Sequence, residues 1–254
     1  MIDERPPGPP DPRTGDPADV LERPETLGVL GGMGPLATAD FLRKLVELSP
    51  AEQDWEQLPI VLGSWPHVPD RIAPILGLDS PSPLPSVIAC ARTLIGAGAR
   101  AVALPCNTVH YWHEALAAAV DVPVFHIVDE VAKRLPEGTR RVGLMATQGT
   151  LKAGLYPQRL GALGVECIQP DDDVLVEALL PAIAAVKRAR LDEAAPLLEG
   201  TLHHLLGRVD VVILACTELP PVVANLSAEL QGACVDSNAT LARACVEWAY
   251  EQRG

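Results

Sequence analysis

Residues 101–108 read AVALPCNT, and residues 211–218 read VVILACTE. Each stretch is a short apolar run that ends in a cysteine, followed by polar residues that include a threonine. Such a run is typical of a buried strand that leads into a turn at the edge of a sheet. The two stretches therefore place Cys106 and Cys216 at equivalent positions, one in each half of the chain.

A second pair of similar segments indicates an internal duplication. LGVLGGMGPLAT at 27–38 resembles VGLMATQGTLKAG at 142–154, and both read as a strand, a turn of small residues and the start of a helix. The two pairs occur in the same order and at similar separations, as expected for repeated units. Between them, apolar runs alternate with helical patterns, which is typical of parallel strands covered by helices on both faces. We therefore predict an α/β protein of two pseudo-symmetric halves with parallel sheets and with the active site between them.

The predicted domain organisation has three parts. Residues 1–25 are rich in proline and acidic side chains and contain little that can pack, so we expect a disordered extension there. The first α/β domain is predicted to comprise 26–125 plus 225–254, and the second 126–224. A ligand that binds between these domains would contact side chains from both.

Composition and charge exclude several classes of protein. The chain has 254 residues, of which 48% are hydrophobic, and a formal net charge of -13. This acidic excess argues against nucleic acid as a partner, because binding to phosphate backbones needs a basic face. No apolar run approaches the roughly 20 residues of a membrane-spanning helix, and the N-terminus lacks the pattern of a signal peptide. We expect a cytoplasmic protein with no membrane partner and with a small molecule as its substrate.

The six cysteines form no CxxC motif and no Cys/His zinc pattern. We therefore expect no metal, and free thiols in a reducing compartment. Four cysteines lie within helix or strand patterns without a polar cluster after them, and packing roles are predicted for these four: Cys90, Cys167, Cys234 and Cys245.

Cys106 and Cys216 stand where an open parallel sheet binds its ligands, beyond the carboxyl ends of the strands. The residues after each cysteine can begin a helix, and a helix N-terminus stabilises a thiolate, so we expect the pKa of both thiols to fall below about 8.5. Two thiols that flank one ligand have the geometry of a cofactor-free racemase. One thiolate removes the proton from a stereogenic carbon, and the other thiol delivers a proton to the opposite face. Asn107, Thr108 and Thr217, with the backbone amides of both turns, are suitable donors to the neighbouring carboxylate.

Six motifs occur in order between residues 27 and 218: LGVLGGMGPLATADFLRKL, PDR at 69–71, LPCNTVH, MATQGTLKAGLY, AVK at 185–187 and ACTE. Together they resemble the aspartate/glutamate racemase family, and specifically its aspartate racemase branch. The resemblance implies two flavodoxin-like halves and a homodimer. It also implies a 1,1-proton transfer on an amino acid without pyridoxal phosphate, another cofactor or a metal, with Cys106 and Cys216 as the catalytic pair.

The resemblance further implies a substrate-binding set around the two cysteines. Arg71 of PDR is similar to an anchor for a substrate carboxylate, and Lys187 of AVK is similar to a second cation near the substrate. Glu218 is expected either to orient the second thiol or to bind the substrate amine. Two turns would line the pocket through Met33, Gly34, Thr147 and Thr150. Two cations suit a dianionic substrate, so aspartate or a related acidic amino acid is the expected substrate.

The segment GSWPHVPDRI at 63–72 departs from the family pattern. Ser64 and Trp65 stand in place of an asparagine-rich stretch, and Ile72 stands in place of a threonine. Trp65 either shortens the pocket or turns it toward an apolar side chain, or it packs beneath the loop. His110, about one helical turn after Cys106, either tunes or relays a proton or has a structural role.

Other functions stay open at this point. One is a relative on the same scaffold that catalyses cis-trans isomerisation or decarboxylation of a dicarboxylate, although such reactions ask different things of the two thiol positions. A racemase for a neutral amino acid is another. The altered segment also fits an amino-acid binder without catalytic activity.

Overall fold

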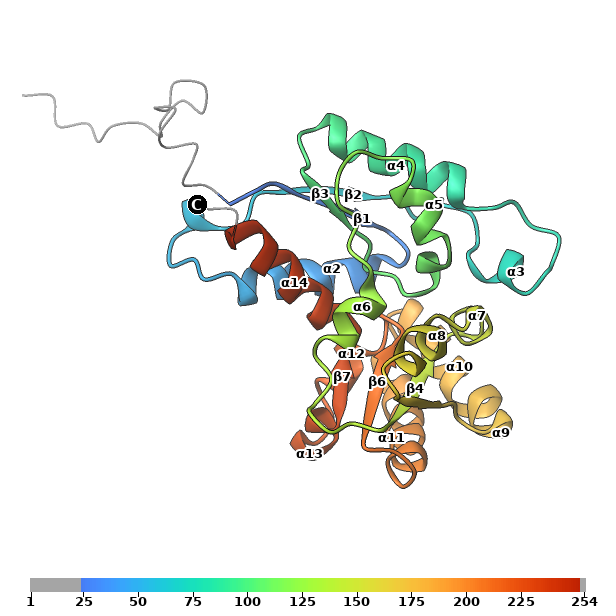
Figure 1. The fold of residues 1–254 in the computed structure, drawn as a ribbon. Coiled ribbons are helices and arrows are strands. Elements are labelled where there is room, and N and C mark those ends of the chain that lie inside the picture. The colour runs from blue at the N-terminus through green and yellow to red at the C-terminus, as the bar shows by residue number, and fades with distance from the viewer. Residues whose placement is uncertain (1–23, 252–254) are drawn as a thin grey trace, which may run out of the picture.

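The computed structural model describes residues 24–251. The extension predicted for 1–25 falls outside these described residues, except for its last two positions. Within them the chain forms two α/β halves, and the last helix, α14, runs beside α2 of the first half (Figure 1).

The first half is built on a three-stranded parallel sheet in the order β2-β1-β3. Its strands are β1 (Leu27–Gly31), β2 (Ile60–Ser64) and β3 (Ala101–Ala103). The central strand, LGVLG, is buried along its whole length, which explains its unbroken run of apolar and small residues. Val124 adds one isolated parallel bridge to Val102 at the edge of β3.

The second half repeats this arrangement with a four-stranded sheet in the order β5-β4-β6-β7. Its strands are β4 (Arg141–Ala146), β5 (Glu166–Ile168), β6 (Val211–Ala215) and β7 (Cys234–Asp236). All pairings are parallel, and β6 lies beside β4 as β3 lies beside β1. The repeated strand order confirms the two similar halves expected from the sequence.

Helices flank each sheet. From the N-terminal side to the start of the second half they are α2 (Pro35–Leu48), η1 (Asp54–Glu56), α3 (Ile72–Ile75), α4 (Leu84–Gly96), η2 (Thr108–Trp112), α5 (His113–Ala117) and α6 (Ile127–Ala132). From β4 onward they are α7 (Gln148–Ala153), α8 (Leu155–Gly161), α9 (Asp172–Val174), η3 (Leu175–Leu179), α10 (Leu180–Lys187), α11 (Leu191–Leu206), α12 (Pro220–Val223), α13 (Ala228–Gly232) and α14 (Ser237–Glu251). The elements η1 and η2 are 3-10 helices, and η3 is a π-helical turn.

Three apolar clusters hold these layers together. One joins α4 to the first sheet, and another joins α10 and α11 to the second sheet. The third lies between the halves and includes Leu27 of β1, Val142 of β4 and Leu241 of α14, whose side chains are fully buried. Because this cluster contains residues of both sheets, burial of apolar surface fixes the halves relative to each other.

The segment 225–254, which was predicted for the first domain, divides between the two halves. β7 pairs with β6 from Val212↔Cys234 to Leu214↔Asp236, so residues 234–236 belong to the second sheet. Of the elements after residue 225, α14 returns to the first half and packs on α2. The physical reason is that β7 satisfies backbone groups along the edge of β6 that would otherwise lack partners.

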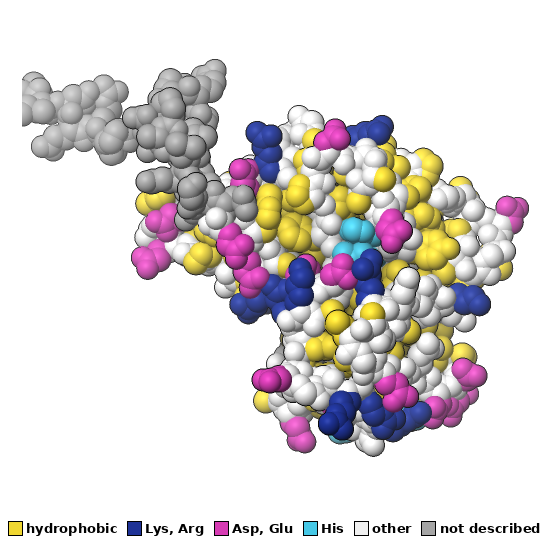
Figure 2. Space-filling model, viewed as in Figure 1, with side chains coloured by type: hydrophobic (Ala, Val, Ile, Leu, Met, Phe, Trp, Pro, Cys, Tyr) yellow, Lys and Arg dark blue, Asp and Glu magenta, His cyan; other side chains and the backbone are white. Residues whose placement is uncertain are grey.

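Charged side chains of both signs are interspersed over the face shown in Figure 2, so the acidic excess does not gather in one patch there. Within residues 24–251, no helix is both long and apolar enough to cross a membrane. The same part of the chain contains no group of three or more His, Cys, Asp or Glu side chains that could hold a metal ion.

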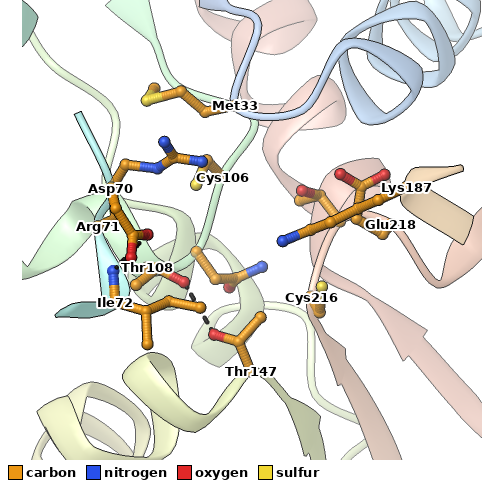
Figure 3. Close-up of a pocket in the computed structure, with 12 residues that line it drawn as sticks. Met33, Asp70, Arg71, Ile72, Cys106, Thr108, Thr147, Lys187, Cys216 and Glu218 are labelled. Carbon is orange, nitrogen blue, oxygen red and sulfur yellow. Dashed lines mark hydrogen bonds between the residues drawn. The ribbon is translucent and has the colours of Figure 1, made fainter. Parts of the chain in front are cut away.

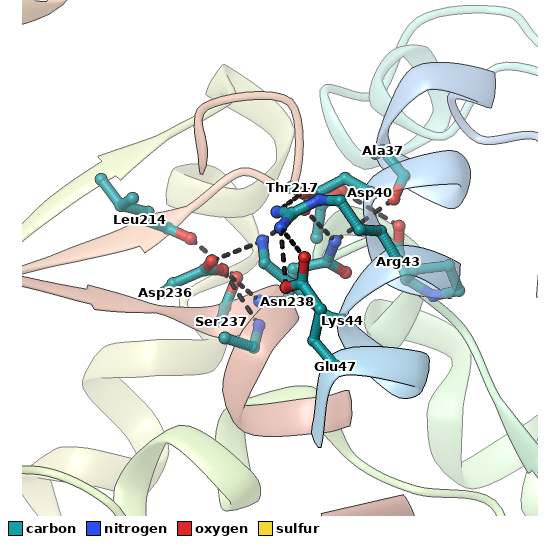
Figure 4. Close-up of polar contacts among 12 residues, drawn as sticks. Ala37, Asp40, Arg43, Lys44, Glu47, Leu214, Thr217, Asp236, Ser237 and Asn238 are labelled. Carbon is teal, nitrogen blue, oxygen red and sulfur yellow. Dashed lines mark hydrogen bonds and ion pairs between the residues drawn. The ribbon is translucent and has the colours of Figure 1, made fainter. Parts of the chain in front are cut away.

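A buried ion network ties α2 to the junction of β7 and α14 (Figure 4). The Lys44 ammonium pairs with Asp40 of its own helix and with Asp236, whose Oδ2 lies 2.6 Å from Nζ. Asn238, in the first turn of α14, donates to Asp40 Oδ2 at 2.9 Å. Burial by itself raises the pKa of Asp40, but Lys44, Arg43 and Asn238 outweigh burial and hold that pKa below its ordinary value. These charged contacts join the first half to the second sheet.

We expect Lys44→Met to lower the free energy of unfolding by about 3 kcal/mol or more, because Asp236 then loses its ion-pair partner and the buried Asp40 keeps only the exposed Arg43 as an ion-pair partner. The matched control is Arg43→Met. Arg43 also bonds Asp40, but its side chain is 53% exposed, so its loss should cost less than about 1 kcal/mol. Denaturant titrations of both variants measure the difference, and equal losses would contradict the role given to Lys44.

Candidate active site

A pocket lies between the two halves, at the carboxyl ends of β3 and β6 (Figure 3). Leu104 and Pro105 lead from β3 to Cys106, and Cys216 follows β6 directly. Both thiols line the pocket and are nearly buried, with exposed fractions of 6% and 5%. The fold thus brings into one cavity two cysteines that come from opposite halves.

Most residues predicted for the site line this pocket: Cys106, Cys216, Met33, Arg71, Asn107, Thr108, Thr147, Lys187, Thr217 and Glu218. The two others lie next to it. The Thr150 hydroxyl is 2.8 Å from that of Thr108 and 3.0 Å from that of Thr147, so it supports the wall from behind. Gly34 faces Glu218, because a Cβ on Gly34 would lie 2.4 Å from Glu218 Oε1. A side chain at position 34 would therefore displace this carboxylate.

Two pocket residues were missed as site residues in the sequence, Asp70 and Ile72. The Asp70 carboxylate accepts the backbone N–H groups of Ile72 and Ala73 at 3.0 and 3.1 Å, and so begins α3 beside Arg71. The PDR motif could have indicated the role of Asp70, since an aspartate before a helix is a common cap. Ile72 closes the pocket toward α7, where a Cβ on Gly149 would lie 3.1 Å from Ile72 Cγ1.

The Trp65 ring lies on β2 and lines neither this pocket nor the cavity beside it. A Cβ on Gly63 would lie 1.9 Å from a ring carbon of Trp65, so the glycine makes room for the ring. The ring packs against the apolar cluster beneath α4. Of the alternatives for Trp65, the structure therefore supports packing beneath the loop.

The residues that follow the two cysteines reach across to the other half. The Thr217 hydroxyl donates to the carbonyl oxygen of Pro105 at 3.0 Å, so the loop of Cys216 is bonded to the residue before Cys106. Asn107 makes no capping hydrogen bond to η2, although a helix start was expected there. Its side chain is buried and contacts the second half instead.

A buried chain of hydrogen bonds runs through Asn107. Tyr156 of α8 donates its hydroxyl proton to Asn107 Oδ1 at 2.6 Å, and Asn107 Nδ2 donates to Ser237 Oγ at 3.0 Å. Ser237 in turn donates to the carbonyl oxygen of Leu214 in β6 at 2.7 Å. Neither partner was predicted from the sequence. The polar residues VDSN after an apolar run were a signal for Ser237, whereas nothing in the helical pattern distinguished Tyr156.

Burial raises the pKa of Cys216 to about 12. The backbone N–H of Glu218 and the Lys187 ammonium lower this pKa, but they do not offset the loss of water around the sulfur. The lowered pKa predicted from a helix N-terminus is therefore wrong for Cys216. The helix that follows, α12, has only four residues and begins beyond Leu219, so its dipole is too weak to prevail. Cys216 consequently holds its proton at neutral pH.

Two cations and two carboxyl groups line the pocket with the thiols: Arg71, Lys187, Asp70 and Glu218. The Arg71 guanidinium is held on its loop, because it donates to the carbonyl oxygens of Val68 and Pro69 at 3.1 and 3.2 Å. The exposed Lys187 side chain extends toward the middle of the pocket (Figure 3). Glu218 is 3% exposed, and within the described chain its Oε2 has no hydrogen-bond partner. Burial raises the pKa of Glu218, and Lys187 and Arg71 partly offset this rise. A buried carboxyl oxygen of this kind can accept a hydrogen bond from a ligand's ammonium group.

His110 supports the Cys106 loop from behind. Its Nδ1 lies 2.8 Å from the carbonyl oxygen of Cys106, and its Nε2 lies 3.3 Å from that of Phe125. Burial and the neighbouring His113 lower the pKa of His110 to about 4, so the imidazole is neutral at pH 7. Of its two alternatives, the contacts support the structural role.

Comparisons with known proteins agree with this architecture. A family model described as Asp/Glu/Hydantoin racemase matches residues 30–245. RacX of Bacillus subtilis strain 168, a broad specificity amino-acid racemase, is 30% identical over 227 residues, which cover 87% of this chain and 96% of RacX. An aspartate racemase from Picrophilus torridus has a solved structure with a TM-score of 0.79 at 28% identity, over 89% of this chain and 94% of that one. An aspartate racemase homologue from Pyrococcus horikoshii OT3, at 24% identity and a TM-score of 0.70, shares the fold over 89% of this chain and 99% of that one.

We expect Tyr156→Phe to lower the free energy of unfolding by about 1–3 kcal/mol, because Asn107 Oδ1 then stays buried without a donor. Tyr111→Phe is the matched control, since Tyr111 is 52% exposed and its loss of a hydroxyl should change stability by less than about 0.5 kcal/mol. Combining Tyr156→Phe with Ser237→Ala should give a non-additive loss, because both side chains bond Asn107. Strictly additive losses would contradict a connected chain.

In a Cys106→Ala variant, alkylation of Cys216 by iodoacetamide should be slow at pH 7 and should rise about tenfold per pH unit up to pH 10, because only the thiolate reacts. Mass spectrometry of the Cys216 peptide measures the rate. A plateau below pH 9 would show that the pKa of Cys216 is not raised by burial.

Proposed function

The chain belongs to the Asp/Glu/hydantoin racemase family and is an amino-acid racemase, and from this premise we propose that it interconverts the enantiomers of aspartate or a related acidic amino acid. The proposed reaction is a 1,1-proton transfer at Cα between Cys106 and Cys216, without a cofactor. The observation that carries this proposal is the presence of both thiols, one from each half, in the wall of one pocket.

In the forward step, the Cys106 thiolate takes the Cα proton, and the electron pair of the C–H bond moves onto the α-carboxylate. The Cys216 thiol then gives its proton to the opposite face of Cα and becomes the thiolate. The reverse step exchanges the roles of the two sulfurs. The raised pKa of Cys216 supports Cys216 as the proton donor of this step.

The charged groups of the pocket suit a substrate with two carboxylates and one ammonium group. Arg71 has the planar donor set that binds a carboxylate in a bidentate manner, and it is the proposed anchor for the α-carboxylate, where negative charge develops. Lys187 would act as a point charge on the second carboxylate, and the buried Glu218 carboxyl would accept the ammonium group.

Two further expectations belong to this proposal. The family resemblance implies a homodimer, which sedimentation velocity tests. The proposed mechanism needs both cysteines as free thiols, which supports a reducing compartment such as the cytoplasm.

Cys106→Ala and Cys216→Ala should each reduce the inversion of aspartate by about 10²–10⁴-fold, because each removes one of the two proton-transfer groups. Chiral chromatography of both enantiomers under reducing conditions measures the rates. The matched control is Cys90→Ala, which removes a partly buried thiol of α4 away from the pocket and should leave the rate unchanged. Inversion that survives in both pocket variants would overturn the two-thiol mechanism.

A further inference from the structure

A second, partly open cavity adjoins the pocket that holds the thiols. Three charged side chains line both spaces: Arg71, Lys187 and Glu218. Beyond them the wall becomes less polar, since no other ionisable side chain of residues 24–251 lines the second cavity. Its apolar wall comes from the turn at the start of α2, from the loop after β2 and from the end of α10, through Pro35, Leu36, Pro66, Val186 and Ala189.

The thiol pocket is closed on the side away from this cavity. Ile72 packs against Gly149 of α7, and a Cβ on Gly149 would also lie 3.1 Å from Thr108 Cγ2. Behind this contact, the hydroxyl groups of Thr108, Thr147 and Thr150 bond one another at 2.8–3.0 Å. A ligand with its Cα between the two thiols therefore finds room for a longer side chain past the charged groups, toward Leu36.

The charges do not require a carboxylate on that side chain. With the α-carboxylate on Arg71 and the ammonium group on Glu218, the remaining cation is Lys187. Lys187 is exposed, so its ammonium group stays hydrated when the substrate offers it no partner, and little binding is lost. A neutral side chain is thus tolerated at the charged boundary and gains from the apolar wall behind it.

We propose that the second cavity is a side-chain subsite and that the protein also racemises neutral amino acids with long, unbranched apolar side chains. This inference rests on the proposed racemase function and extends its substrate class. Each methylene that enters the cavity should raise kcat/KM about fourfold, as expected for burial of apolar surface.

The test is a homologous series of alanine, 2-aminobutyrate, norvaline and norleucine, with aspartate as reference. The measurement is kcat/KM for the inversion of Cα. Norleucine should exceed alanine by about 60-fold, the product of three methylene steps. A flat series alongside active aspartate would overturn the subsite and leave the racemase function intact. No reaction with any of these amino acids would instead overturn the racemase proposal on which the subsite depends.

A variant that fills the second cavity tests whether the preference for long side chains arises there. Leu36→Trp places a large ring in the cavity and should bring the norleucine-to-alanine ratio close to one. The matched control is Leu42→Trp, in the same helix, equally half-buried and away from both cavities, which should keep the ratio of the unmodified protein. Leu36→Ala, which enlarges the cavity, should shift the preference toward a side chain longer than that of norleucine. If Leu36→Trp and Leu36→Ala leave the ratio unchanged, or if Leu42→Trp lowers it as much as Leu36→Trp does, the assignment of the cavity is wrong.

Discussion

The active site depends on hydrogen bonds that cross from one half of the chain to the other beside the two thiols. The Thr217 hydroxyl bonds the carbonyl oxygen of Pro105, and Asn107 bonds Ser237, which bonds the end of β6. Each half supplies one cysteine, so neither half alone defines the distance between the sulfurs. The shared apolar core brings the halves together, and these directional contacts orient the loops. Proton transfer at one carbon needs such positioning, because small displacements of the reacting groups slow it severely.

Removal of water shapes the chemistry of the pocket more than any dipole does. Burial raises the pKa of Cys216 to about 12 and raises that of Glu218, although Lys187 lowers both and the backbone N–H of Glu218 also lowers that of Cys216. A thiol that keeps its proton is suited to act as an acid, whereas the partner thiol must supply the thiolate. Burial therefore decides that Cys216 enters the proposed reaction as a thiol.

The sequence predicted the features that repeat or that follow a strand. Two similar Cys motifs led to Cys106 and Cys216, and the order of apolar runs led to two parallel sheets. The sequence did not predict contacts between residues far apart in the chain, nor the effect of burial on pKa values. No residue pattern around Tyr156 indicates its hydrogen bond to Asn107. Strand β7 has only three residues, too few to predict which sheet it joins. The pKa of Cys216 depends on how completely the folded chain excludes water from the sulfur.

The central claim is that two different groups act on opposite faces of Cα. The most direct test is the inversion of one enantiomer of aspartate in D₂O, followed at early times by mass spectrometry of the separated enantiomers. A two-thiol mechanism predicts that the newly formed enantiomer carries one deuterium at Cα while the remaining substrate still carries its original proton. Equal deuterium in both enantiomers, or a product that retains the original proton, would contradict the account, because either result means that a single group serves both faces.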